Sequence, residues 1–167
     1  MSKEVLINYD NINRKEFPFE YLINSNKHED HGNPAIYYMT GDCHTFAIAL
    51  AECLNIEKPS FLVLLEKVED DFKDEYELEP VFHVFLYINN NIYDVRGKFN
   101  KNNVLKGFKE NIREYLIIKI MNQNELFKYI SSGPCDIKPL GEISYKEMEI
   151  AKEIILRTNY IKKVNLK

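Results

Sequence analysis

Hydrophobic residues recur along the chain in two different patterns, one typical of helices and one typical of strands. Over residues 42–55 the apolar side chains are spaced by three and four positions, which places them on one face of a helix. Asp42 at the start of this run is a favourable N-cap residue, and Pro59 follows the run, as is common after a helix end. Further helices are expected over residues 18–26, 123–131 and 144–158.

Other stretches have the apolar character of strands. Residues 81–88 are apolar on both faces, which is typical of a strand inside a sheet. Three asparagines follow at 89–91 and predict a turn, after which the chain returns as a second strand. The strands are expected over residues 60–68, 81–88, 91–96 and 115–121. Together with the helices they predict a single α+β domain over residues 1–167, with an antiparallel sheet of about four strands.

Composition narrows the class of protein. The chain has 167 residues, 45% of them hydrophobic and 29% charged, which is ordinary for a globular domain and unlike a disordered chain. The net charge of −4 argues against bulk electrostatic binding to nucleic acid. We expect no signal peptide, and because the sequence has no run of about 18 apolar residues we expect no membrane span. The three cysteines, Cys43, Cys53 and Cys135, form no disulfide framework, and we expect a cytoplasmic protein without cofactor or metal.

Negative charge is concentrated in one segment between two predicted strands. Residues 66–79 contain eight acids and two lysines, a local charge of −6. We expect a solvated loop here. If the loop lies at the rim of a functional site, it would favour a basic peptide or an amine.

Cys43 falls in the first turn of the helix expected over 42–55. It shares a stripe with Phe46, Ala47 and Leu50, so the thiol is expected where the buried face meets the open N-terminal end. Unpaired N–H groups and about half a positive charge at this end stabilise a thiolate and lower its pKa. They can also hold a developing oxyanion. This placement suits a nucleophile, although a small buried thiol is the commoner fate of a free cysteine.

A nucleophilic cysteine needs a base, and the base needs an orienting partner. His83 is the best base because it interrupts an otherwise apolar strand, and Asp94 is the best orienting residue. A two-residue turn over 89–90 would pair Ile88 with Asn91 and put Asp94 on the same face as His83. A three-residue turn would put the two side chains on opposite faces, so the pair depends on the register.

Two segments together resemble a known family. Gly-Asp-Cys-His-Thr-Phe-Ala over 41–47 and His-Val-Phe-Leu-Tyr-Ile-Asn-Asn-Asn-Ile-Tyr-Asp over 83–94 look like the transglutaminase-like branch of the papain-like cysteine hydrolases. The resemblance covers residues 38–97. It implies a papain-like fold in which the helix that bears the cysteine packs on the antiparallel sheet. By this resemblance Cys43 would be the nucleophile, His83 the base and Asp94 the orienting residue.

Groups that could hold the oxyanion or the substrate are less clearly marked. The candidates beside the nucleophile are Tyr38, Asp42 and His44, and we expect His44 to line the cleft or face solvent rather than act as the base. Tyr37 and Asn33 lie further upstream as weaker donors. The chain also has no Trp, which many proteins of the transglutaminase-like branch carry soon after the histidine.

The leading hypothesis is a thiol-dependent hydrolase or acyltransferase of peptidase, amidase or deamidase type. It would act on a protein or peptide through a cysteine thioester. The alternative is a non-enzymatic binding or inhibitor protein on the same fold, encoded by a phage or mobile element. A third hypothesis is a metal site in the loop that contains His28 and His31, although their irregular spacing favours no metal.

Overall fold

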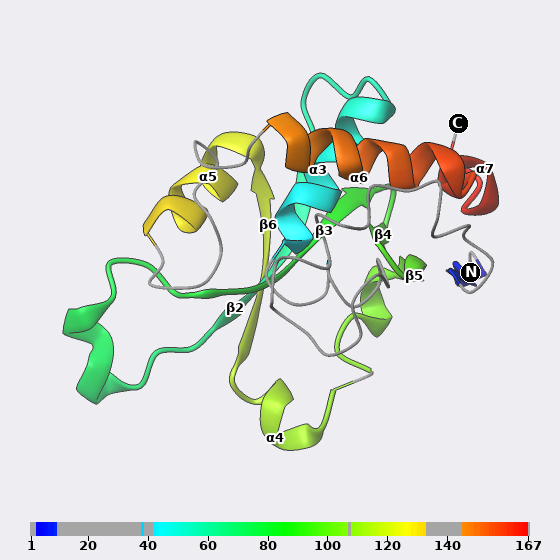
Figure 1. Ribbon diagram of the computed structural model, residues 1–167. Coiled ribbons are helices and arrows are strands. Elements are labelled where there is room, and N and C mark those ends of the chain that lie inside the picture. The colour runs from blue at the N-terminus through cyan, green and yellow to red at the C-terminus, as the bar shows by residue number, and fades with distance from the viewer. Residues whose placement is uncertain (1–2, 10–37, 39–41, 107, 133–144, 167) are drawn as a thin grey trace.

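The computed structural model describes residues 3–9, 38, 42–106, 108–132 and 145–166. They form an α+β fold on a six-stranded antiparallel sheet with the order β1-β5-β4-β3-β2-β6 (Figure 1). The strands are β1 (Val5–Leu6), β2 (Ser60–Glu66), β3 (Val81–Ile88), β4 (Asn91–Asp94), β5 (Gly97–Asn100) and β6 (Leu116–Asn122). The helices are α3 (Cys43–Cys53), α4 (Glu110–Arg113), α5 (Gln123–Ser132), α6 (Tyr145–Arg157) and α7 (Tyr160–Lys163), with 3₁₀-helices η1 (Asp70–Glu75) and η2 (Lys101–Asn103).

The expectation of about four strands was wrong, because β1 and β5 extend the sheet beyond the predicted hairpin. β1 has two residues, and β5 has four with the sequence Gly-Lys-Phe-Asn, so neither shows a clear strand alternation. The two pair with each other, Val5 opposite Lys98 and Leu6 opposite Gly97. Partners so distant in sequence leave no local signal in either segment.

The hairpin of β3 and β4 has the register on which the sequence argument depended. Ile88 pairs with Asn91 across a two-residue turn. Asn89 and Asn90 in this turn have φ values of 47° and 63°. Positive φ at both central positions is typical of a type I′ turn, whose twist matches that of the flanking strands, and Asn tolerates it well. Of the two turns that the sequence left open, the structure has the two-residue one.

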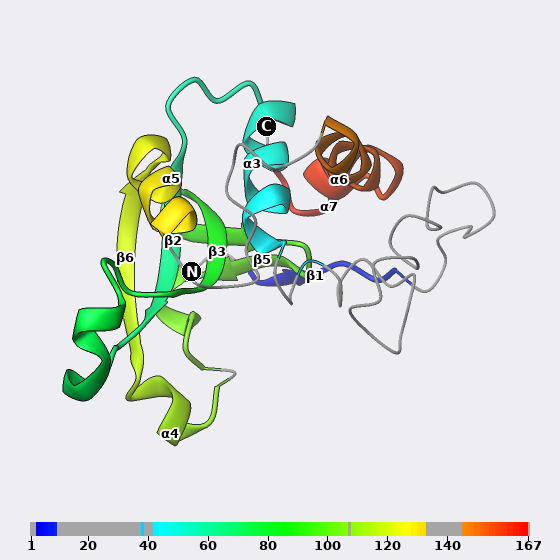
Figure 2. The ribbon, with the colours of Figure 1, turned by 60° about the vertical axis from the view of Figure 1, so that its left-hand side comes forward.

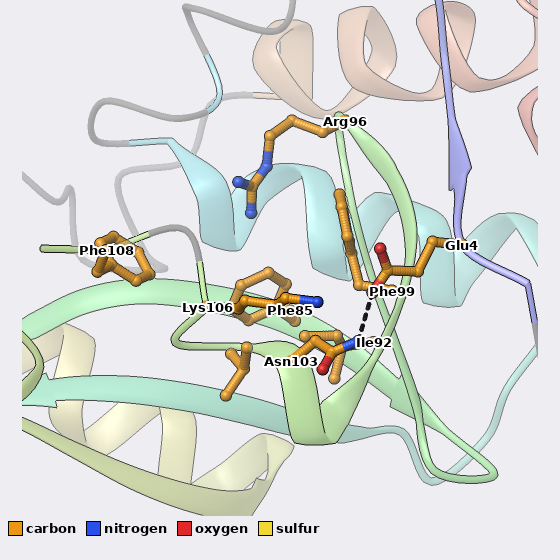
Figure 3. Close-up of a pocket in the computed structure, with 9 residues that line it drawn as sticks. Glu4, Phe85, Ile92, Arg96, Phe99, Asn103, Lys106 and Phe108 are labelled. Carbon is orange, nitrogen blue, oxygen red and sulfur yellow. Dashed lines mark hydrogen bonds between the residues drawn. The ribbon is translucent and has the colours of Figure 1, made fainter. Parts of the chain in front are cut away.

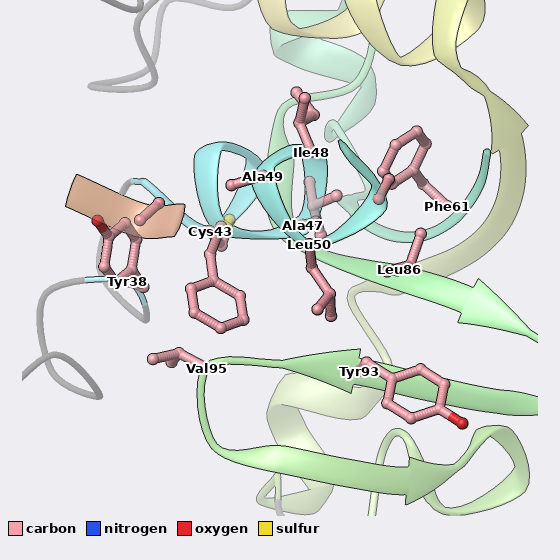
Figure 4. Packing of buried hydrophobic residues seen from close by; sticks show 14 of the residues in the cluster. Tyr38, Cys43, Ala47, Ile48, Ala49, Leu50, Phe61, Leu86, Tyr93 and Val95 are labelled. Atoms are coloured by element: carbon pink, nitrogen blue, oxygen red, sulfur yellow. The ribbon is translucent and has the colours of Figure 1, made fainter. Parts of the chain in front are cut away.

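Helix α3 lies between the sheet and α6, so these elements form successive layers (Figure 2). All of its residues from Cys43 to Ala51 are buried. Figure 4 shows α3 over the strands, with Ala47 and Leu50 near Leu86. The helices expected over 42–55, 123–131 and 144–158 are confirmed as α3, α5 and α6, whereas the one expected over 18–26 lies outside the described residues.

The opposite face of the sheet carries a second, smaller cluster. Phe85 and Ile92 point to this side and are buried there beneath Val104 and Phe108 from the chain after β5. His83 and Asp94 alternate onto the same face as Phe85 and Ile92. The candidate base thus lies beside this second cluster.

Two surface segments differ in how well they were predicted. The acidic segment forms η1, which is fully exposed and projects away from α3 in both ribbon views. The expected solvent exposure is confirmed. The segment does not lie beside α3. No helix was predicted after residue 158, but the structure has α7 there; Tyr160 in this helix and Val164, which follows it, are fully buried.

Candidate active site

The start of α3 places the candidate nucleophile. Asp42 occupies the N-cap position, and Cys43 follows in the first turn. Cys43 is buried in the same core cluster as Phe46, Ala47 and Leu50 of this helix. Figure 4 shows Cys43, Ala47 and Leu50 along α3. Cys43 is only 3% exposed. The thiol therefore lies in a dry environment at the positive end of an 11-residue helix.

The two neighbouring strands place the candidate base and its partner. His83 on β3 and Asp94 at the end of β4 are joined by a buried bond of 2.9 Å between Nε2 and Oδ2. Each residue is 2% exposed. The bond engages Nε2 of the ring, so Nδ1 is the nitrogen left to face the thiol. The sequence prediction that Asp94 shares a face with His83 is confirmed by this contact.

An irregularity in the sheet lies beside His83. Leu64 of β2 pairs with His83, but the next residue, Leu65, pairs with Val81, so Phe82 is an extra residue on β3. A bulge of this kind bends the strand and redirects a side chain, and bulges are common next to active sites. Nothing in the apolar run over 81–88 indicates where the bulge falls.

Cys43 and His83 are close enough to shift each other's ionisation. Burial alone would raise the pKa of Cys43, but the positive charge of the His83 imidazolium, with a smaller effect from His44, lowers it from 9.0 to about 6. Burial alone would lower the pKa of His83, but the Cys43 thiolate and the bond to Asp94 raise it from 6.5 to about 9. The favoured state at neutral pH is thus a thiolate beside an imidazolium.

Arg96 is a residue of the candidate site that was not predicted from the sequence. Its Nη2 donates to Asp94 Oδ2 at 2.6 Å, its Nε donates to the same oxygen at 3.0 Å, and its backbone N–H donates to Oδ1 at 2.8 Å. Burial alone would raise the pKa of Asp94, but the bonds from His83 and Arg96 lower it. Asp94 therefore stays charged. The available signal was an Arg two residues after the Asp, at a tight turn.

The turn between β4 and β5 is held from two distant parts of the chain. Tyr160 Oη on α7 donates to the carbonyl oxygens of Asp94 at 2.5 Å and Gly97 at 2.9 Å. The hydroxyl of Tyr9 donates to the carbonyl oxygen of Val95, and the N–H of Ile7 donates to the carbonyl oxygen of Arg96 at 2.8 Å. All four carbonyl groups of this turn are engaged, which fixes the position of the carboxylate.

The candidates for oxyanion or substrate binding lie around the start of α3. Tyr38 is buried, and its ring packs against Phe46 with centroids 5.4 Å apart. Asp42 is buried at the N-cap. His44 is fully buried beside the thiol, which contradicts the expectation that it could face solvent. Within the described chain, neither ring nitrogen of His44 has hydrogen-bond geometry to a partner.

Three further points of the sequence analysis concern a metal site, candidate residues upstream of α3 and a membrane span. Among the described residues, no group of three or more Cys, His, Asp or Glu side chains could hold a metal ion. His28, His31, Asn33, Tyr37 and Cys135 all lie outside those residues. In the part of the chain that the structure describes, no helix is long and apolar enough to cross a bilayer.

Comparisons of the chain with protein-family models, curated proteins and solved structures find no match. The chemistry of the site is therefore the basis for inferring a function.

Proposed function

We propose that this protein is a thiol-dependent hydrolase or acyltransferase of the papain-like, transglutaminase-like type, in which Cys43 is the nucleophile, His83 the base and Asp94 the orienting residue. The observation that supports this most strongly is geometric: a buried 2.9 Å bond joins His83 to Asp94 beside Cys43 at the start of α3, where the imidazolium lowers the pKa of the thiol. An ordinary buried thiol has a raised pKa, because burial disfavours the thiolate.

In the proposed reaction, Cys43 Sγ attacks a carbonyl carbon, and the carbon–nitrogen bond of the amide breaks. His83 gives its proton to the departing amine, leaving a thioester on the cysteine. Water or a second amine then attacks the thioester while His83 takes the proton from it. The products are an acid or a new amide, and the free thiolate returns with the imidazolium. Asp94 stays ionised throughout and fixes the imidazole orientation.

The start of α3 supplies the proposed stabilisation of the oxyanion. Backbone N–H groups of the first helical turn have no partner within a helix and point along its axis. They lie next to Cys43, where the negative charge on the carbonyl oxygen develops. His44, buried beside the thiol without a partner among the described residues, is a second potential donor.

The proposed substrate is a protein or peptide amide, with peptidase or amidase action first and deamidation or transamidation second. The chemistry needs no cofactor. It requires reduced cysteine, and both described cysteines, Cys43 and Cys53, are free. A cytoplasmic location would maintain that state.

A binding or inhibitor function on the same fold is the second candidate. It is favoured by the low exposure of Cys43 and His83, 3% and 2%. A substrate carbonyl must reach the thiol, and in this structure both side chains are covered. In a binding protein, the same three residues would serve as a buried polar network.

Acylation by a small activated ester separates the two candidates. We expect p-nitrophenyl acetate to release nitrophenolate in a burst and to leave an acetyl group on Cys43, located by peptide mass spectrometry. His83→Ala should slow the burst by about 10²-fold or more, because the base and the cation that stabilises the thiolate are both lost.

Cys53 provides the internal control for this experiment. It is partly exposed, and burial raises its pKa, so Cys53→Ser should leave the burst unchanged. Acetylation of Cys53 but not of Cys43 would refute the proposed enzyme and leave the binding function.

A further inference from the structure

A pocket of about 370 Å³ adjoins the candidate active site on the face of the sheet opposite α3 (Figure 3). Its walls come from β3, β4 and β5 and from the chain that follows η2. Three phenylalanines, Phe85, Phe99 and Phe108, line it together with Arg96 and Lys106. Concave, mostly apolar sites of this size with a few polar groups are typical of small-ligand binding.

Two residues belong both to the pocket and to the surroundings of the triad. The Phe85 ring packs edge-on against the His83 ring, with centroids 4.5 Å apart. Arg96 bonds to Asp94 through Nε and Nη2. A group bound in the pocket therefore lies one side chain away from the base and one from the orienting carboxylate.

Arg96 and Lys106 bring positive charge to the pocket lining and Glu4 brings negative charge, while the Arg96 guanidinium is also paired with Asp94. The Arg96 guanidinium lies 4.9 Å from the Phe99 ring centroid and its side chain is 37% exposed. Its Nη1 makes no hydrogen bond within the described chain, so two N–H donors remain for a ligand. Lys106 adds an exposed ammonium group. The acid at the pocket, Glu4, accepts a bond from Asn103 at 2.9 Å.

We propose that this pocket binds a large apolar, preferably aromatic, side chain that has a free carboxylate beside it, as the C-terminal aromatic residue of a peptide has. The three phenylalanine rings cover the side chain. Arg96 Nη1 donates one charge-assisted hydrogen bond to the carboxylate, since Nε and Nη2 already bond to Asp94, and the Lys106 ammonium supplies the second contact. The proposal rests on the proposed function in taking this group as part of the substrate, but the binding itself needs no chemistry.

Binding of three small probes to the wild-type protein tests this directly by NMR titration. Hydrocinnamate has the ring and the carboxylate, hydrocinnamyl alcohol lacks the charge, and butyrate lacks the ring. We expect hydrocinnamate to bind about tenfold more tightly than either of the others, with shifts at Phe99 and Phe108. None of the probes offers a peptide bond, so failure of catalysis does not affect the result.

A matched pair of lysine variants locates the carboxylate. Lys106→Gln should weaken hydrocinnamate binding by about threefold or more, and Lys106→Glu should weaken it further. Lys109→Gln, at an exposed lysine that does not line the pocket, should change nothing. Equal binding of the three probes, no binding, or the same effect of Lys106→Gln and Lys109→Gln would overturn the proposal. Acylation of Cys43 by the ester would still stand in that case.

Discussion

The two sides of the candidate site are built very differently. On the strand side, Asp94 accepts bonds from His83 and Arg96, and every carbonyl of the adjoining turn is engaged. On the helix side, both nitrogens of His44 and the hydroxyl of Thr45 are buried without a partner in the described part of the chain. An unpaired buried polar group costs about 1–3 kcal/mol.

The difference separates a strand side that hydrogen bonds hold in place from a helix side whose buried polar groups lack such bonds among the described residues. In the proposed reaction, the base and its carboxylate are held in place before the substrate binds, so proton transfer needs little reorganisation. The buried polar groups of His44 and Thr45 lie in the first turn of α3 next to the proposed nucleophile. Four variants test this contrast.

Removing the charge of the orienting carboxylate should have the largest effect. In Asp94→Asn, the pKa of His83 falls and the imidazole loses its fixed orientation, so acylation of Cys43 should slow by about 10²-fold or more. Stopped-flow release of nitrophenolate measures it. Asp70→Asn, at an exposed acid that pairs with Lys73, is the matched control and should have no effect. An active Asp94→Asn protein would show that the strand side does not orient the base.

Gly97→Ala should break the strand side by steric conflict. Gly97 has φ 136°, and an added Cβ would lie 1.9 Å from the carbonyl oxygen of Val5. β1 must then move away, and the residue keeps a strained backbone, at a cost of about 2–3 kcal/mol in the free energy of unfolding. Urea denaturation compares it with Lys98→Ala, the next residue of β5, which should lose far less. Equal losses would mean that the contact with β1 does not matter.

Tyr160→Phe removes one hydroxyl that serves two carbonyls. Both oxygens lose this donor in a buried place, so we expect a loss of about 1 kcal/mol in unfolding free energy. The acylation rate should fall with it, because Asp94 is less firmly placed. Tyr87→Phe provides the comparison, since its hydroxyl bonds to Asn90 at the surface. If both variants unfold at the same urea concentration, the account of a fixed turn is contradicted.

His44→Leu should act in the opposite direction on stability. It removes two buried nitrogens that lack partners among the described residues, so the free energy of unfolding should rise by about 1 kcal/mol. Because His44 helps lower the pKa of Cys43, that pKa should rise in the variant. Calorimetry and cysteine titration give the two readouts. A destabilised variant with an unchanged thiol would mean that His44 is an ordinary core residue.

Local sequence was enough to predict the central elements and the site's main residues. The spacing of Phe46, Ala47 and Leu50 predicts α3, and the asparagines at 89–91 predict a turn there. The sequence left the length of that turn open, and the two-residue turn in the structure gives the register that brings Asp94 to His83. These features depend on neighbours in sequence, so periodicity and turn chemistry reveal them.

The parts that were missed depend on distant contacts. β1 pairs with β5 across most of the chain, and α7 is held by the burial of Tyr160 rather than by helix propensity. Arg96 was overlooked because its role follows from the turn that aims it at Asp94. The burial of His44 depends on what surrounds α3, which its own sequence does not specify.

The most direct test of the account is the ionisation of Cys43 itself. The ultraviolet absorbance of the thiolate, taken as the difference between wild type and Cys43→Ala across pH, isolates this one thiol. The account predicts a midpoint near pH 6, and a midpoint at least about one unit higher when His83→Ala is present in both proteins. A wild-type midpoint at or above about 8.5, where an ordinary thiol ionises, would contradict a thiolate–imidazolium pair and with it the proposed chemistry.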